Sequence, residues 1–522
     1  MSLNYKNIGL LLSFNTINVV LSIINSTLMV YFFGTSAEVE AFFAASVLGT
    51  AVSRFVQTGQ LVEIIIPRYH KVKQEESPQA ARSIIATLCN FMVAAASVMV
   101  IVFMLAGQWV VNWLVPGFNP SVQQHVLEIF YWTGFLMPIQ IATNLFQGLL
   151  TTENVYGKAE MTNTVSLVIT IVILLVWGQN GNVYALISSL VASVVLQFVT
   201  VAYYLRQLGY RHSFQWRNPH FSPRELLRAT SATTFYMVGV QIYTFLFNAA
   251  LSMLPAGTFA IYRYVEIIYG KVANIFMLPI STVFFNDINQ FIVQNKTEQV
   301  RSYVSKNLNF SYFLSLALFL PFWAGGSYFI WVLWGGSKFD ATDAQKVYEL
   351  LCVFFFGLVL LGPYMLFRKL AVSATKPDLQ YYLWGVTQVC SGGIGYSLIR
   401  WWGFEGIMIQ TIIHSMLMSA VPICTIFWLK KNFFGWYSPT EVLKITAGLG
   451  VSLLLGIGLQ LFWQPFSYYT KLADLGISMV LALLPVLLYL GCSLWLKVAE
   501  IQLIREKIGK KWNNQWAKSR PS

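Results

Sequence analysis

Charge is scarce in this sequence. Only 11% of its 522 residues are Asp, Glu, Lys or Arg, whereas soluble domains carry about 25%. Hydrophobic residues make up 56% of the chain, against about 45–50% in soluble domains. A water-soluble core has no use for so much apolar surface, so the composition excludes a soluble globular protein and indicates that lipid surrounds most of the chain.

Signatures of common enzyme sites are also missing. The chain has no GxxxxGK[ST] phosphate loop, no HExxH, no GxSxG and no paired-cysteine motif, so no ATPase, metalloprotease or serine hydrolase is indicated. We interpret the five cysteines as small apolar packing residues: Cys89, Cys352, Cys390, Cys424 and Cys492. The sequence therefore predicts no enzyme, no metal site and no cofactor.

The apolar residues fall in separate stretches that are long enough to cross a membrane. About 20 helical residues, rising 1.5 Å each, span about 30 Å of hydrocarbon. The sequence thus predicts an all-α polytopic membrane protein with about fourteen transmembrane helices. The predicted spans lie near 8–33, 40–66, 83–107, 124–150, 159–178, 182–205, 230–254, 257–285, 307–333, 347–367, 380–400, 404–429, 443–463 and 475–496.

Basic residues are distributed unevenly between the loops of this layout. With the N-terminus inside, 27 of the 34 Lys and Arg residues fall on cytoplasmic segments and 4 on outer loops. Lys and Arg gather on the cytoplasmic side of membrane proteins, so we predict that both termini are cytoplasmic. Because the net charge of +13 is dispersed over loops, no nucleic-acid partner is indicated. The three remaining cations, Arg54, Arg263 and Lys271, fall inside predicted spans.

A basic segment midway along the chain divides the spans into two groups of six, a layout common in transporters. The predicted domains are an N-lobe of spans 1–6 at 1–205, a basic cytoplasmic linker at 206–229, a C-lobe of spans 7–12 at 230–430, spans 13–14 at 431–496, and a basic cytoplasmic tail at 497–522. We interpret the linker as a solvated loop that contacts anionic lipid. Recognition of a partner by the same segment is the alternative.

Polar residues inside the predicted spans gather on single faces of four helices. A spacing of three or four residues places side chains on one face of a helix. These residues are Asn15, Asn18, Ser22 and Asn25 in span 1; Ser46, Thr50, Ser53, Arg54, Gln57 and Gln60 in span 2; Thr234, Gln241, Thr244 and Asn248 in span 7; and Tyr262, Arg263, Glu266, Tyr269 and Asn274 in span 8. Helices 1, 2, 7 and 8 are therefore the candidate walls of a polar cavity.

Two explanations compete for these faces. Hydrogen bonds between helices account for Ser, Thr and Asn, but not for Arg54 and Arg263, since an arginine at the centre of a span costs about 2.5–3.5 kcal/mol to insert. Arginine matches phosphate oxygens bidentately, so we interpret the two arginines as an anion site. Glu266, three residues after Arg263, is spaced to pair with it. Lys271 either adds charge to the cavity or extends toward the interface.

Three segments resemble a known family. FGTSAEVEAFFAASVLGTAVSRFVQTGQLVEIIIPRY at 33–69 resembles the corresponding stretch of the MurJ/MviN lipid II flippases, in the multidrug/oligosaccharidyl-lipid/polysaccharide exporter superfamily. VPGF at 115–118 resembles the PGF that follows that family's third span, and IYRYVEIIYGKV at 261–272 resembles its eighth-helix segment. The resemblance extends along the whole chain, and the combination of segments carries it.

The resemblance implies a V-shaped pair of six-helix lobes around a cationic cavity built from helices 1, 2, 7 and 8, with a groove for a polyprenyl tail between helices 13 and 14. It matches Glu40 to the family's acidic residue at the start of helix 2, Arg54 to its helix-2 arginine and Arg263 to its helix-8 arginine. Other positions depart from the family, which typically carries further arginines where this chain has Val19, Asn25 and Ser53. The implied cavity is therefore less cationic than is typical of the family.

From these observations we predict a flippase of the bacterial inner (cytoplasmic) membrane. It is expected to move an undecaprenyl-pyrophosphate-linked glycan, such as lipid II, to the outer leaflet by alternating access. Its expected partners are this anionic glycan, the bilayer, and enzymes of cell-envelope or polysaccharide synthesis. The alternatives are an exopolysaccharide or O-antigen repeat-unit flippase, a cation-coupled drug exporter of the same superfamily, and a membrane scaffold without transport activity.

Overall fold

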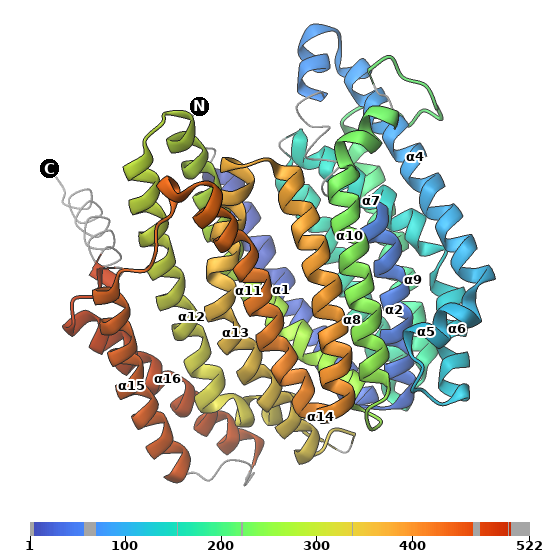
Figure 1. Cartoon of the computed structure of the whole chain (residues 1–522). Coiled ribbons are helices and arrows are strands. Elements are labelled where there is room, and N and C mark those ends of the chain that lie inside the picture. Colours follow the sequence, from blue (N-terminus) through green and yellow to red (C-terminus); the bar gives the residue numbers. More distant parts are fainter. Residues whose placement is uncertain are drawn as a thin grey trace, which may run out of the picture. The chain divides into compact units, whose positions relative to one another are not determined.

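The structure, a computed structural model, describes residues 5–56, 69–153, 155–220, 223–336, 338–462, 470–499 and 501–502. Almost all of these residues lie in α-helices (Figure 1). Within the described ranges, pairing of the β type consists of isolated bridges such as the one between Gly336 and Phe339. The predicted all-α class is confirmed.

The chain folds into two compact units, Met1–Tyr264 with Gln388–Gly406, and Val265–Thr387 with Ile407–Ser522. The first unit contains α1 (Tyr5–Phe33), α2 (Ala37–Val56), α4 (Pro78–Leu105), α5 (Gly107–Leu114), α6 (Pro120–Thr133), α7 (Leu136–Thr152), α8 (Tyr156–Trp177), α9 (Val183–Gln207) and α10 (Pro223–Ser252). The second contains α12 (Thr297–Trp334), α13 (Ala341–Ala374), α15 (Pro439–Phe462) and α16 (Lys471–Trp495). Two helices, α11 (Thr258–Val293) and α14 (Pro377–Leu429), contribute to both units.

Within each unit, particular pairs of helices pack against one another. In the first unit α8 packs against α1 and α9, and α4 packs against α7 over a core that includes Leu88, Leu145 and Val201. In the second unit α12 packs against α13 and α16. A Cβ at Gly325 of α12 would lie 2.6 Å from the carbonyl oxygen of Ser478 in α16, so the close approach of these two helices requires a glycine.

Ten of the described helices are long and apolar enough to cross a membrane, or eleven if the bent pair α6 and α7 forms one span. The bend between α6 and α7 is 50°, and it falls inside the predicted span 124–150. The count covers only described residues, treats α14 as one helix, and includes neither α2 nor α11. The chain is therefore a polytopic membrane protein.

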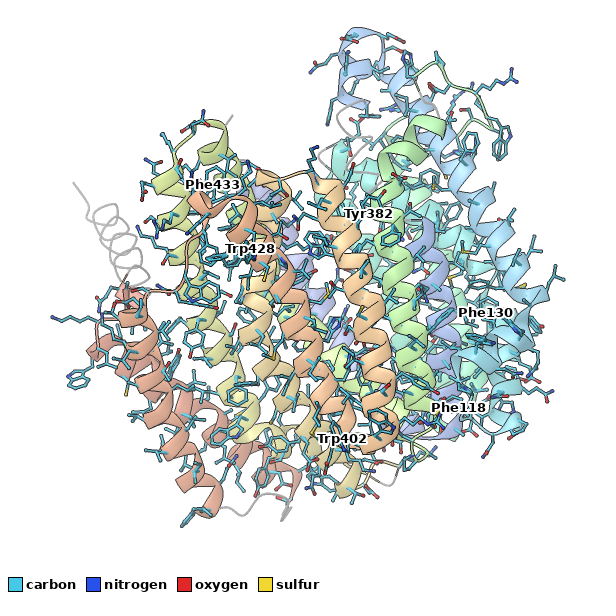
Figure 2. All side chains as sticks on the ribbon, in the orientation of Figure 1. Phe118, Phe130, Tyr382, Trp402, Trp428 and Phe433 are labelled. Atoms are coloured by element: carbon cyan, nitrogen blue, oxygen red, sulfur yellow. The ribbon has the colours of Figure 1, made fainter. Side chains whose placement is uncertain are left out.

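Large apolar side chains cover the outside of these helices. Leu105 is 85% exposed, Trp401 is 74% exposed and Leu483 is 57% exposed. Figure 2 shows one of the exposed tryptophans, Trp402, within α14. Exposure of this kind is unfavourable in water but is expected where lipid tails cover the surface, and tryptophan is enriched at the membrane interface.

The helix α14 is broken near its middle. Its 53 residues run from Pro377 to Leu429, and Gly403 inside it has φ 57° and ψ −129°, a conformation that residues with a Cβ rarely adopt. A Cβ at Gly406 would lie 2.3 Å from the carbonyl oxygen of Leu398, so the chain after the break passes close to the chain before it. The break falls in the predicted gap between spans 380–400 and 404–429.

Candidate functional site

Arg263 is held by a buried amide in the first unit. Its Nη2 donates a hydrogen bond to Oδ1 of Asn248, which is 1% exposed on the neighbouring helix α10. The amide nitrogen of Asn248 donates in turn to the carbonyl oxygen of Thr244 at 2.5 Å. The guanidinium carbon lies 5.3 Å from the ring centroid of Phe259 and 5.7 Å from that of Tyr262, distances suited to cation–π attraction. Two predicted site residues, Arg263 and Asn248, thus form one group.

Gln241 lies two helical turns before Asn248 and belongs to the same predicted polar face of α10. Its side chain is 3% exposed, and within the described residues neither its amide oxygen nor its amide nitrogen has a hydrogen-bond partner. Leaving a buried polar group without a partner costs about 1–3 kcal/mol. Such a group calls for an explanation, and a polar ligand that reaches this face would supply one.

Glu40 in the first turn of α2 binds the N-terminus of α11. Its Oε1, on a side chain that is 4% exposed, accepts hydrogen bonds from the backbone N–H groups of Phe259 at 3.0 Å and Ala260 at 3.4 Å. The first N–H groups of a helix have no partner within the helix and attract negative charge. Nearby, the Tyr264 hydroxyl donates to the carbonyl oxygen of Gly34 at 2.6 Å. The corner between α1 and α2 therefore fixes the start of the helix that carries Arg263.

The VPGF segment also contacts the turn between α10 and α11. The backbone N–H of Gly117 donates to Oγ of Ser252 at 3.0 Å, and the Phe118 ring lies 5.4 Å from the Phe259 ring (Figure 2 labels Phe118). A Cβ at Gly117 would lie 2.4 Å from the carbonyl oxygen of Ser252. Glu40 and VPGF, both identified through the resemblance alone, therefore converge on the turn between α10 and α11.

We predict that Glu40→Ala destabilises the protein while Glu38→Ala does not. The Glu40 variant leaves two buried N–H groups without an acceptor, at a cost of about 1–3 kcal/mol, so thermal unfolding of the purified protein should occur at lower temperature. Glu38 lies in the same first turn of α2 and serves as the matched control. Equal unfolding temperatures for the two variants would contradict this role of Glu40.

The predicted polar face of α1 binds a carboxylate on α8. Nδ2 of Asn18 lies 3.4 Å from Oε2 of Glu160, and Oδ1 of Asn18 accepts a hydrogen bond from the Thr164 hydroxyl at 2.7 Å. Glu160 Oε2 also accepts from Nδ2 of Asn163 at 3.1 Å, and Oδ1 of Asn163 accepts from Gln197 of α9 at 2.7 Å. A polar network therefore crosses the first unit from α1 to α9.

Sequence reasoning missed Glu160, which is marked only as an acidic residue at the start of the predicted span 159–178. On the same face of α1, Ser22 is buried, and Oδ1 of Asn25 is buried without a partner in the described part of the chain. The backbone of Asn15 lies in α1, and its side chain is outside the described residues.

The remaining predicted site residues belong to the predicted spans 2 and 8. Ser53 is half-buried on α2. Arg54 lies in α2, but its side chain, like the whole of Gln57, is outside the described residues. Glu266 is half-buried and Lys271 is exposed, and both belong to the part of α11 that lies in the second unit. Among the described residues no group of three or more His, Cys, Asp or Glu side chains is placed to hold a metal ion.

Comparison with known proteins gives the same family that the three segments at 33–69, 115–118 and 261–272 resemble. The sequence profile of "Lipid II flippase MurJ" matches residues 29–374. The chain belongs to the MurJ lipid II flippase family. It is therefore a transporter of the flippase type and not an enzyme. A probable lipid II flippase MurJ from Rhizobium tropici is 20% identical over 508 residues, which cover 93% of each chain.

Solved structures agree on the fold. The inward closed conformation of a lipid II flippase MurJ superposes with a TM-score of 0.73 at 16% identity, covering 94% of this chain and 99% of that chain. The inward-facing conformation of a multidrug resistance MATE family transporter of the MOP superfamily gives a TM-score of 0.61 at 14% identity, covering 81% and 97% of the two chains. At these identities the likeness shows a shared fold.

Proposed function

We propose that this chain moves an undecaprenyl-pyrophosphate-linked glycan of the lipid II type from the cytoplasmic leaflet of the bacterial inner membrane to the outer leaflet. The observation that carries the proposal is Arg263, a guanidinium fixed by Asn248 and two aromatic rings in a chain of the MurJ family. A fixed fork of N–H donors suits the oxygens of a pyrophosphate, and its charge persists at any relevant pH.

The proposed topology has fourteen crossings with both termini in the cytoplasm. Every predicted span overlaps a described helix, and the two arms of α14 correspond to two spans. Spans 1–6 and 7–12 form the two proposed lobes, joined by the basic segment 206–229, and spans 13 and 14 follow them. The 27-to-4 distribution of basic residues between the two sides supports this orientation.

In the proposed mechanism Arg54 and Arg263 bind the pyrophosphate while the lipid tail stays in the membrane. Asn248 acts by holding the Arg263 guanidinium, and Gln241, Asn25 and Ser53 offer polar atoms to the sugars. Asn15, Asn18 and Gln57 extend the predicted polar faces of spans 1 and 2, and Glu266 and Lys271 are further charged residues of the predicted span 8. Rocking of the two lobes then exposes the cavity to each side in turn.

A strain depleted of its own lipid II flippase tests this function. Expression of the chain should restore growth, and vesicles containing the purified protein should move labelled lipid II between leaflets. Failure in both assays, with the protein present in the membrane, would contradict a lipid II substrate.

A membrane potential is expected to drive the cycle. A substrate of about −2 neutralises a site of about +2, and the empty cationic cavity is drawn inward by a negative-inside potential at about 2.3 kcal/mol per charge per 100 mV. Collapsing the potential should slow flipping several-fold. A rate that does not change would exclude this driving force.

One observation favours a second candidate, an exopolysaccharide or O-antigen repeat-unit flippase. Val19, Asn25 and Ser53 stand where the resemblance places further arginines, so the site is less cationic than the family typically shows. A repeat unit with fewer negative groups than lipid II would fit such a site. Transport of lipid-linked repeat units without transport of lipid II, in the same vesicles, would favour this candidate.

A further inference from the structure

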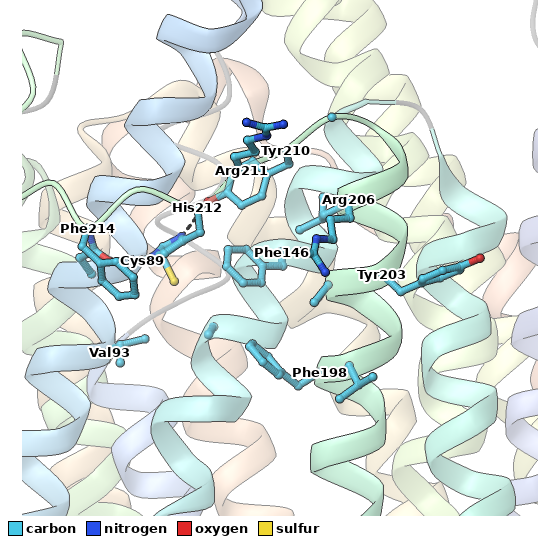
Figure 3. Close-up of a pocket in the computed structure, with 16 residues that line it drawn as sticks. Cys89, Val93, Phe146, Phe198, Tyr203, Arg206, Tyr210, Arg211, His212 and Phe214 are labelled. Carbon is cyan, nitrogen blue, oxygen red and sulfur yellow. Dashed lines mark hydrogen bonds between the residues drawn. The ribbon is translucent and has the colours of Figure 1, made fainter.

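A cavity whose lining does not include Arg263 lies in the first unit. Its volume is about 1070 Å³, and it is bounded by α4, α7, α9 and a segment after α9 that we call the strap, residues 208–217 (Figure 3). Figure 3 shows Arg211 and Tyr210 on the strap above Phe146, the Arg206 side chain extending down to the level of Phe146, and Phe198 below them. The wall of the cavity is therefore cationic on the side of the strap and apolar toward Phe198.

Asn90 of α4 contacts the strap at three points. Nδ2 of Asn90, which is 7% exposed, donates to the carbonyl oxygens of Ser213 at 3.0 Å and Gln215 at 2.9 Å. Oδ1 of Asn90 lies 2.9 Å from Nε2 of His212, and the Tyr210 hydroxyl lies 3.0 Å from Nδ1 of the same ring. These bonds hold the cavity wall in place, so the cavity is preformed.

The positive charge of this cavity comes from two arginines. The side chains of Arg206 and Arg211 line it, both are exposed, and within the described ranges neither forms an ion pair with an acidic side chain. Burial lowers the pKa of His212, so its ring is neutral at pH 7. Two uncompensated guanidinium groups attract an anion, most effectively a phosphate.

The apolar wall of the cavity suits a hydrocarbon chain. Phe146, Phe198, Val93 and Ala142 line the cavity with carbon atoms, and Val199, which also lines it, is 54% exposed. These apolar walls contribute no binding free energy to a free phosphate, whereas burial of an acyl chain against them contributes about 0.8 kcal/mol for each CH₂. Arg206 and Arg211 belong to the basic set that the charge distribution assigns to the cytoplasmic side, where anionic phospholipids lie.

We propose that this cavity binds one anionic diacyl phospholipid of the cytoplasmic leaflet, with its phosphate on Arg206 and Arg211 and an acyl chain against Phe146 and Phe198. The site is separate from Arg263, and it does not depend on which glycan the chain transports. The lipid is held between the strap and the membrane-embedded helices, and so fastens the basic segment to the bilayer.

Native mass spectrometry of the full chain in detergent, with added phosphatidylglycerol, tests this proposal. The wild type and the control Arg217→Gln should retain the lipid, because Arg217 is exposed in the same strap and does not line the cavity. The double variant R206Q/R211Q should bind it about 25-fold more weakly, at about fivefold per basic residue. Ala202→Trp, which fills the cavity without changing its charge, should also lose the lipid.

Three results would overturn the proposal. The first is equal retention of phosphatidylglycerol by R206Q/R211Q and R217Q. The second is equal retention of phosphatidylcholine and phosphatidylglycerol by the wild type, which would remove the role of lipid charge. The third is displacement of the lipid by inorganic phosphate at comparable concentration, which would make a free anion the ligand. Identical unfolding temperatures of the variants check that each is folded.

Discussion

Replacing Arg263 by alanine is expected to reduce lipid II flipping in vesicles about 100-fold. A charge-assisted hydrogen bond to an anion contributes about 1.5–3 kcal/mol, and the upper figure corresponds to about 100-fold in binding. The variant also removes the hydrogen bond to Asn248, so the buried amide oxygen of Asn248 loses this donor. In a strain depleted of its own flippase the variant should fail to support growth.

The matched control is Arg400→Ala, which removes an exposed arginine of the same unit. Arg400 donates a hydrogen bond to the Tyr396 hydroxyl at 3.3 Å, and its loss should leave flipping unchanged. Arg263→Lys keeps the charge but lacks the planar fork and should recover only part of the activity. Full complementation by Arg263→Ala, at normal membrane levels, would show that the anion is bound elsewhere.

Adding a single methyl group at Gly117 is expected to have the second large effect. In Gly117→Ala the new Cβ would lie 2.4 Å from the carbonyl oxygen of Ser252 and 2.5 Å from Cα of Met253. These are backbone atoms, so the turn between α10 and α11 must move, at a cost of about 1–3 kcal/mol for overpacking. The purified protein should unfold at lower temperature and flip lipid II more slowly, because the same turn positions Arg263.

Gly450→Ala in α15 is the control for this substitution. A Cβ there would meet nothing within 4 Å, and alanine is the better helix former by about 1 kcal/mol, so stability should be unchanged or higher. If Gly117→Ala behaves like Gly450→Ala in both assays, the turn tolerates displacement and does not position the site.

Most of the helical framework could be predicted because the bilayer dictates it. A spanning segment must be helical, apolar and about 20 residues long, so hydropathy located segments such as α4 and α9 closely. The spacing of polar residues placed Asn248 and Gln241 on one face of α10, and the structure shows both buried. The bond between Asn248 and Arg263 joins two faces that the sequence had marked as polar.

Other features depend on contacts between distant segments, which no local pattern encodes. Asn90 is a lone amide side chain in the predicted span 83–107, and the carbonyl groups that it binds lie 123 and 125 residues further along the chain. Glu160 takes its role from the packing of α8 against α1, which places Asn18 beside it. The span 124–150 was predicted as one segment, whereas the described helices α6 and α7 meet at a bend of 50°.

The break in α14 determines how many times this helix crosses the membrane. As a straight rod its 53 residues would extend about 80 Å at 1.5 Å each, more than twice the hydrocarbon thickness of about 30 Å. Near its start Trp384 lies under Arg368 of α13, 4.8 Å from the guanidinium to the ring, and near its end Ile426 shares a core with the adjacent Phe367. The helix α14 therefore folds back on itself as a hairpin, and its two ends lie at the same level. If its two arms are counted as two crossings, α15 begins on the side of the membrane on which α14 began.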